Sequence, residues 1–231
     1  MEIIHATGID GAREARGIVV VIDVLRSFTV SAYALAGGAR ECRLVPTVAE
    51  ALALAARLPG ALLSAEENAL PIEGIAISNS PTQVSAATLK DRILVQRSSA
   101  GTPVVAAVSD GHDIFAASLV VAQATAQACL LREPAALTLV ASADHPEDHA
   151  CARYMEAIIR DQAADIDQLL EPLRESPRYA RVMRGEWPGF PPSDLDLALT
   201  PDRFDFAMPV TRQDGYLQVV AAPAATPRPS P

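Results

Sequence analysis

The sequence predicts an α/β protein with a largely parallel or mixed sheet and helices on both of its faces. Short apolar runs alternate with longer Ala/Leu-rich segments, an order typical of parallel strands joined by helices. Residues 17–22 are apolar almost throughout, as expected for a strand that is covered on both faces. Hydrophobic residues make up 50% of the chain, which is enough for a substantial core.

The strands are predicted from short apolar runs that end at polar or small residues. In chain order they are expected at residues 2–5, 17–22, 41–45, 61–65, 92–96, 113–116 and 135–141, with a further strand at 216–220. A loop is expected at 66–80, where no periodic apolar pattern is present. The strands therefore alternate with helices through the first two thirds of the chain.

Helix boundaries are marked by local capping signals. Thr47 with Glu50 three positions later has the pattern of a capping box, and Ser80 followed by Pro81 is typical of an N-cap and a first helical residue. Helices are accordingly expected at residues 28–37, 47–57, 81–87, 102–108 and 119–131, with a long helix that begins near 146.

The C-terminal third is more polar and more irregular. Helices are expected there at 165–173, 176–184 and 194–199. We predict one α/β domain over residues 1–221, with any subdivision near 140–150. The Pro/Ala-rich residues 222–231 are predicted to be a flexible tail.

Charge and composition exclude several classes of protein. The chain has 28 acidic and 19 basic residues and a net charge of −9, which does not favour a nucleic-acid partner. Neither a signal peptide nor a membrane span is indicated, so we expect a cytoplasmic protein, and a homo-oligomer is compatible with this class. The cysteines, Cys42, Cys129 and Cys151, have no metal-type spacing and are expected to be buried thiols. An acidic enzyme of this kind can bind an anionic substrate through local arginines or a divalent cation.

The first candidate site follows the strand at 17–22. Asp23 can ligate a cation, while Arg26 can bind a phosphate or sulfonate oxygen pair, with Ser27 beside them. Ligands in open α/β sheets collect at the carboxyl ends of strands. An alternative is a surface Asp–Arg pair with Ser27 as a helix cap. Glu66 follows another strand, where a solvated acidic loop is the alternative.

Two further turns suit an anion. Asn79 and Ser80 precede a predicted helix, whose N-terminal N–H groups favour negative charge, although capping alone explains Ser80. The other turn is rich in small and hydroxyl residues that can approach phosphate oxygens closely, namely Ser98, Ser99, Gly101 and Thr102. It is neither a Walker A loop nor a dinucleotide fingerprint.

An acidic cluster with histidines follows the strand at 135–141. His145 and His149 have the spacing of two metal ligands on one helix face. Glu147 and Asp148 can bind Mg²⁺ or a water, or can simply suit the first turn of a helix. No His-Glu-x-x-His or Gly-x-Ser-x-Gly motif is present, which counts against a zinc protease or a serine hydrolase.

Taken in order, these segments resemble the 2-phosphosulfolactate phosphatase family nearly from end to end. The most specific part is Ile22-Asp23-Val24-Leu25-Arg26. The other segments are Glu66, Gly74 with Asn79-Ser80-Pro81, Ser99-Ala100-Gly101-Thr102, Glu147-Asp148 with Cys151-Ala152, and the late residues 202–205 and 208–210.

The resemblance implies an α/β Mg²⁺-dependent phosphomonoesterase that converts 2-phosphosulfolactate to sulfolactate and phosphate, on a route to coenzyme M. It implies that Asp23 and Glu66 hold Mg²⁺. Arg26 and the turn at 98–102 bind phosphate or sulfonate oxygens, and Asn79 with Ser80 completes the anion site. Asp148 or Glu147 assists proton transfer.

Four positions depart from the usual pattern of the family. Glu67 stands where a basic residue is common, Ala76 where Asp is common, Ser78 where Gly is common and Ala100 where Asn is common. These departures leave two alternatives open. One is a phosphatase of another small phosphorylated acid, and the other is a catalytically silent protein that binds a small anion.

Overall fold

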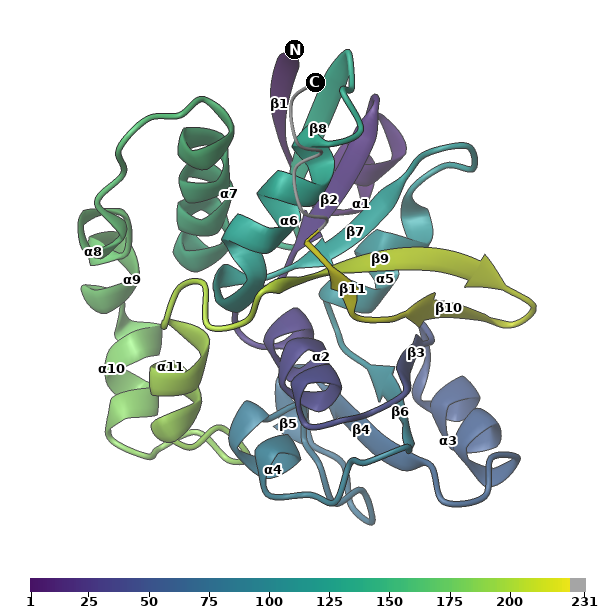
Figure 1. Ribbon diagram of the computed structural model, residues 1–231. Coiled ribbons are helices and arrows are strands. Elements are labelled where there is room, and N and C mark those ends of the chain that lie inside the picture. Colours follow the sequence, from purple (N-terminus) through teal and green to yellow (C-terminus); the bar gives the residue numbers. More distant parts are fainter. Residues whose placement is uncertain (225–231) are drawn as a thin grey trace.

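The strands assemble into one mixed sheet (Figure 1). The computed structural model describes residues 1–224. Within them the sheet has 11 strands, which are β1 (Glu2–Thr7), β2 (Ile18–Ile22), β3 (Glu41–Leu44), β4 (Leu62–Glu67), β5 (Leu70–Pro71), β6 (Ile93–Arg97), β7 (Ile114–Ala117), β8 (Ala136–Ala141), β9 (Phe206–Gln213), β10 (Tyr216–Val219) and β11 (Ala222–Pro223).

The sheet contains two parallel blocks. The strand order is β1-β8-β2-β7-β9-β10-β3-β6-β4-β5, with β11 paired to β9. In the first block β1, β8, β2 and β7 run parallel, and in the second β3, β6 and β4 do. Antiparallel β9 and β10 join the blocks, which occupy the upper and lower parts of the view in Figure 1. The predicted fold class is therefore confirmed.

The strand β9 in the middle of the sheet was not predicted. Its sequence contains Pro209, which lacks the N–H that a central strand normally needs. The pairing explains why proline is tolerated: β10 pairs with residues 210–213 of β9, and β11 pairs with 206–207. Pro209 thus lies where one neighbouring strand ends and the next has not begun.

The helices cover both faces of the sheet, and all but α1, which was not predicted, lie close to their predicted positions. In chain order they are α1 (Gly8–Arg13), α2 (Ser27–Ala36), α3 (Val48–Ala56), α4 (Pro81–Ser85), α5 (Gly101–Ala107), the 3-10 turn η1 (Leu119–Val121), α6 (Ala122–Leu130), α7 (Pro146–Ile159), α8 (Ile166–Leu169), α9 (Glu171–Arg174), α10 (Pro177–Met183) and α11 (Ser193–Ala198). The capping box of Thr47 and Glu50 is formed as predicted.

Three predicted segments differ from the structure. The helix expected at 119–131 begins with the 3-10 turn η1. The helix expected at 165–173 is divided into α8 and α9, because Pro172 cannot continue the hydrogen bonding of the first helix. The loop expected at 66–80 contains the end of β4 and the short β5, joined by Asn68 and Ala69 at φ angles of 53° and 61°, as in a tight hairpin turn.

Strand β2 shows why helices are needed on both faces. Val19 and Val21 pack into one core cluster with Phe28 of α2, whereas Val20 and Ile22 pack into another with Met155 of α7. Each buried side chain of this size contributes roughly 1.5–3 kcal/mol relative to exposure. Burial on both faces therefore holds the end of β2, and the residues that follow it, in a fixed position.

The remaining predictions concern the cysteines, the membrane and the tail. All three cysteines are free and buried, as expected. Among residues 1–224, none of the helices has the length and apolar character that a membrane crossing requires. The tail expected at 222–231 is described only at its start, where Ala222 and Pro223 pair with β9; residues 225–231 lie outside the described part.

Candidate active site

The carboxyl ends of strands from both parallel blocks meet at one cavity. Asp23 and Ser142 follow β2 and β8 of the first block, while Glu66 and Ser98 lie at the ends of β4 and β6 of the second. All four residues line a cavity of about 180 Å³. Of the predicted site residues, those on its wall are Asp23, Arg26, Glu66, Asn79, Ser98 and Ser99. Strand ends are the usual place for a ligand in α/β proteins.

The carboxylate of Asp23 is buried and held by the start of α2. Its Oδ1 accepts a hydrogen bond of 2.9 Å from the backbone N–H of Ser27. Burial raises the pKa of Asp23 above its ordinary value, and the hydrogen bond from Ser27 and the nearby charge of Arg178 oppose that shift. A positive group that enters the cavity would therefore favour the ionised carboxylate.

Gly101 allows the turn at 98–102 to approach this carboxylate closely. A Cβ atom at position 101 would lie 2.7 Å from Asp23 Oδ2 and 3.0 Å from Ser27 Oγ. Any larger residue must push the carboxylate aside. Gly101 and Ser27 therefore shape the cavity without lining it.

We expect Gly101→Ala to reduce the activity of the site by about a hundredfold, because a displacement of roughly 1 Å in a reacting group can have that effect. Overpacking should lower the free energy of unfolding by about 1–3 kcal/mol. The turnover number and the melting temperature would be measured together. Ala106→Ser, on the exposed face of the same helix α5, adds one heavy atom elsewhere and should leave both unchanged. Equal activity in Gly101→Ala and wild type would contradict this role for the glycine.

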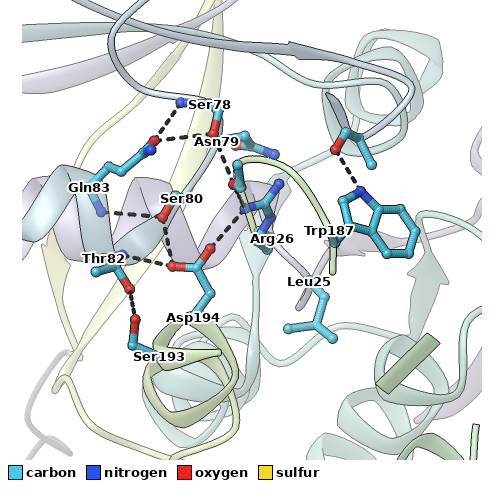
Figure 2. Close-up of polar contacts among 12 residues, drawn as sticks. Leu25, Arg26, Ser78, Asn79, Ser80, Thr82, Gln83, Trp187, Ser193 and Asp194 are labelled. Atoms are coloured by element: carbon cyan, nitrogen blue, oxygen red, sulfur yellow. Dashed lines mark hydrogen bonds and ion pairs between the residues drawn. The ribbon is translucent and has the colours of Figure 1, made fainter. Parts of the chain in front are cut away.

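The guanidinium of Arg26 is fixed by the C-terminal segment. Its Nη1 donates to Asp194 Oδ2 at 2.8 Å and to the carbonyl oxygen of Gly189 at 2.5 Å. The guanidinium carbon lies 3.9 Å from the centre of the Phe190 ring. Burial lowers the pKa of Arg26, while the hydrogen bond to Asp194 opposes the shift. Arg26, whose ion pair with Asp194 is drawn in Figure 2, is consequently a preoriented cation on the cavity wall.

Glu66 joins two turns at the cavity. Its carboxylate accepts hydrogen bonds from the backbone N–H groups of Ser99 and Ala69 and from the Ser99 hydroxyl. Ala69 has a left-handed φ of 61°, which is strained for alanine. Glu66 thus holds the 98–102 turn against the β4–β5 hairpin.

Several predicted anion-binding hydroxyls have structural partners instead. The Ser80 hydroxyl donates to Asp194 Oδ1 at 2.7 Å and caps α4 (Figure 2). Within the 98–102 turn, Ser98 Oγ accepts from the Thr102 N–H, and the Thr102 hydroxyl donates to the Ser98 carbonyl oxygen. Ser80 and Thr102 do not line the cavity, so their contribution is to position other groups.

The structure does not bring Glu147 and Asp148 to the cavity wall. Asp148 accepts hydrogen bonds from the backbone N–H of Val24 and the hydroxyl of Ser142, at 2.8 and 2.9 Å, and so ties α7 to the end of β2. Burial, followed by the charges of Asp23 and Glu147, raises the pKa of Asp148 well above its usual range. Glu147 is fully buried and pairs with Arg178. Both carboxyl groups are buried in the first turn of α7 and lie behind the cavity wall.

The C-terminal segment supplies cavity residues that were not predicted. Arg178 of α10 and Phe190 line the cavity, while Asp194 of α11 anchors Arg26 from behind. Arg178 also donates to the carbonyl oxygen of Leu25 at 3.1 Å. These two residues are 153 positions apart in the sequence, and no local motif around Arg178 predicts the contact. His145, at the N-cap of α7, also lines the cavity.

Few side chains of the cavity wall can act as ligands of a metal ion. Within residues 1–224 no cluster of three or more His, Cys, Asp or Glu side chains is arranged to hold a metal. His145 lines the cavity, whereas His149 contacts Asp144 at 2.8 Å, so the histidine pair does not form a joint site. Asp23 and Glu66 are the carboxylates on the cavity wall.

The four departures from the family pattern lie in different places. Glu67 and Ala76 are exposed and do not line the cavity. Ser78 is committed to the carbonyl oxygen of Gly189, to which its hydroxyl donates at 2.9 Å. Ala100 lies on the cavity wall. Only the last of these four substitutions therefore changes the cavity lining directly.

Comparison with known proteins gives a consistent result. A family model described as 2-phosphosulpholactate phosphatase matches residues 5–173. A protein of Bacillus subtilis (strain 168) named "Probable 2-phosphosulfolactate phosphatase" is 31% identical over 207 residues, which cover 87% of this chain and 90% of the relative. Proteins with the same name from Carboxydothermus hydrogenoformans and Deinococcus radiodurans are 31% and 35% identical over 147 and 114 residues. These matches cover 62% and 49% of this chain, and 61% and 48% of the relatives.

Proposed function

The chain belongs to the 2-phosphosulfolactate phosphatase family, and we propose that it hydrolyses 2-phosphosulfolactate to sulfolactate and phosphate with the aid of Mg²⁺. The observation that carries this proposal is the composition of one cavity wall, where two arginines, Arg26 and Arg178, accompany two carboxylates, Asp23 and Glu66. Guanidinium groups bind the oxygens of phosphate and other acids in pairs. The substrate carries three such acid groups.

Asp23 and Glu66 are the residues that would hold Mg²⁺. This ion commonly uses one or two protein carboxylates and leaves its other positions to water and phosphate oxygens, which this pair of donors fits. Asp23 Oδ2 has no hydrogen-bond partner within the described residues and faces the turn at Gly101. When bound, Mg²⁺ would neutralise phosphoryl charge and orient the attacking water.

Side chains of the cavity wall bind the substrate and supply the proton. Arg26, rigidly held beside Asp23, binds the phosphoryl oxygens, and Arg178 binds the carboxylate or sulfonate of the same molecule. Glu147 keeps Arg178 in place from the buried side. The imidazole of His145 lies on the cavity wall; it gives a proton to the oxygen that leaves the phosphorus and regains one from the water that has attacked. In this arrangement Glu147 and Asp148 position other groups and do not transfer the proton themselves.

Phosphate release from a small panel of esters tests the proposal. We expect turnover of 2-phosphosulfolactate that requires Mg²⁺ and is lost with EDTA, and at least about tenfold lower kcat/KM for 2-phospholactate, which lacks the sulfonate, because one charge-assisted contact is worth about that factor. Turnover unaffected by EDTA would contradict the metal component.

The same panel separates the other two candidate functions. Ala100 on the cavity wall favours a second candidate, a phosphatase of another small phosphorylated acid. Faster turnover of 2-phospholactate or phosphoglycolate would support this candidate over the first. Phosphate binding without turnover of any ester would instead identify a silent anion-binding protein.

A further inference from the structure

A buried chain of hydrogen bonds lies behind Asn79 and is not part of the cavity wall. At its centre is Gln96 of β6, which is fully buried. Its amide nitrogen lies 2.7 Å from the carbonyl oxygen of Ser27 and 3.1 Å from Asn79 Oδ1. Its amide oxygen accepts a hydrogen bond of 2.6 Å from the hydroxyl of Ser31. The side chain thus contacts both α2 and the turn before α4.

The direction of every hydrogen bond in this chain follows from one group. The carbonyl oxygen of Ser27 can only accept, so the nitrogen end of Gln96 must face it. That same nitrogen then donates to Asn79, which must present its oxygen to Gln96. The opposite orientation of Gln96 would place two oxygen atoms against each other at 2.7 Å, at a buried position where an unmade hydrogen bond is costly.

The orientation of Asn79 has a consequence in the cavity. Asn79 lines the cavity wall, is 4% exposed and has a left-handed φ of 57°, so its backbone is fixed as well. With the oxygen turned toward Gln96, the NH₂ group is the end that remains for the cavity. This end can donate hydrogen bonds but cannot ligate a cation.

We propose that Gln96 is a positioning residue that locks the Asn79 amide with its NH₂ group toward the cavity, where it donates to an oxygen of the phosphoryl group. This inference rests on the proposed function for the identity of the anion. It adds that Asn79 recognises a hydrogen-bond acceptor and is not a metal ligand. It also means that Gln96 affects binding through Asn79, without touching the substrate itself.

A double-mutant cycle with inorganic phosphate as the probe tests the inference. The variants are Gln96→Met, which keeps the length of the side chain, Asn79→Ala, and the two together, with the dissociation constant measured by calorimetry. We expect each single variant to weaken phosphate binding about tenfold, as for a hydrogen bond to a charged group. In the Asn79→Ala background, Gln96→Met should have no further effect. Fully additive losses would overturn the proposal.

Two further variants separate positioning from general damage. Ser64 pairs in register with Gln96 on the neighbouring strand β4, and its buried hydroxyl has no partner within the described residues. Ser64→Ala should therefore leave phosphate binding unchanged. If Gln96→Met does not fold, Ser31→Ala removes only the hydroxyl that holds the Gln96 oxygen. It should weaken binding about threefold, and only when Asn79 is present, because a neutral hydrogen bond is worth less than a charged one.

The test distinguishes this inference from the proposed function. Wild-type protein that binds phosphate and shows the non-additive cycle, but hydrolyses no ester, would contradict the phosphatase proposal and support the role of Gln96. Active protein with an additive cycle would do the reverse. Wild-type protein that binds no phosphate at millimolar concentration would overturn the inference.

Discussion

Asp23→Asn is expected to lower the rate of phosphate release by roughly a thousandfold, the scale seen when a group that acts in the reaction is removed. Asparagine has the shape of aspartate and retains an oxygen for the 2.9 Å hydrogen bond from the Ser27 N–H. The substitution thus removes the charge at the end of β2 and keeps the local structure. The measurement is kcat for 2-phosphosulfolactate at saturating Mg²⁺.

The same substitution is expected to increase stability. Burial raises the pKa of Asp23, so the folded protein holds this proton to a higher pH than the unfolded chain. As the pH rises from about 4 through the raised pKa, wild type loses stability that the asparagine variant retains. The melting temperature of the variant, measured with EDTA, should therefore exceed that of wild type increasingly over this range. A gain of about 1 kcal/mol corresponds to roughly 2–4 °C.

Asp113→Asn is a suitable control for Asp23→Asn, since it also removes one negative charge. Asp113 is exposed, pairs with Arg132 and immediately precedes β7, at the end of that strand away from the cavity. Its replacement should change neither hydrolysis nor the pH dependence of melting appreciably. If Asp23→Asn hydrolysed the ester as fast as Asp113→Asn, the proposed metal and reaction site would be wrong.

The parts of the site that could be predicted are those built from neighbouring residues. Asp23, Arg26 and the 98–102 turn follow apolar runs that the local sequence already predicts as strands, and strand ends are where α/β proteins bind ligands. The direction of a side chain is harder to predict. Glu147 and Asp148 lie in the first turn of a helix, as expected, but they do not line the cavity. Their carboxylates contact Arg178 and the backbone of Val24 instead.

The residues that were missed act across long distances in the sequence. Arg178 and Asp194 reach the site only when the C-terminal helices fold against the end of β2. This folding brings Asp194 into contact with Arg26, which is 168 positions away in the sequence. Strand β9 was missed for a related reason, because Pro209 counts against a strand until the gap between β10 and β11 is known. Neither the long-range contacts nor the strand β9 produces a periodic or local pattern in the sequence. The family match at 5–173 likewise ends before Arg178 and Asp194.

Asp194→Ala is expected to destabilise the protein by about 3–5 kcal/mol, because it leaves the buried guanidinium of Arg26 without its counter-charge. Both side chains of the pair are at most 3% exposed, and they approach to 2.8 Å. The substitution also removes the acceptor for the Ser80 hydroxyl and the Thr82 N–H. The melting temperature should fall by roughly 6–20 °C, as measured by calorimetry, and hydrolysis should fall with it, since Arg26 is no longer oriented.

A double variant separates the structural part of this effect from the functional part. Arg26→Met with Asp194→Leu replaces the buried ion pair by apolar side chains of similar volume, which is often neutral or stabilising. We expect it to recover much of the stability lost in Asp194→Ala and to remain inactive. A folded double variant that still hydrolysed the ester would show that Arg26 only supports the fold. Recovery of stability without activity would mean that the C-terminal helices retain a charged pair at this buried position because the guanidinium binds the phosphoryl group.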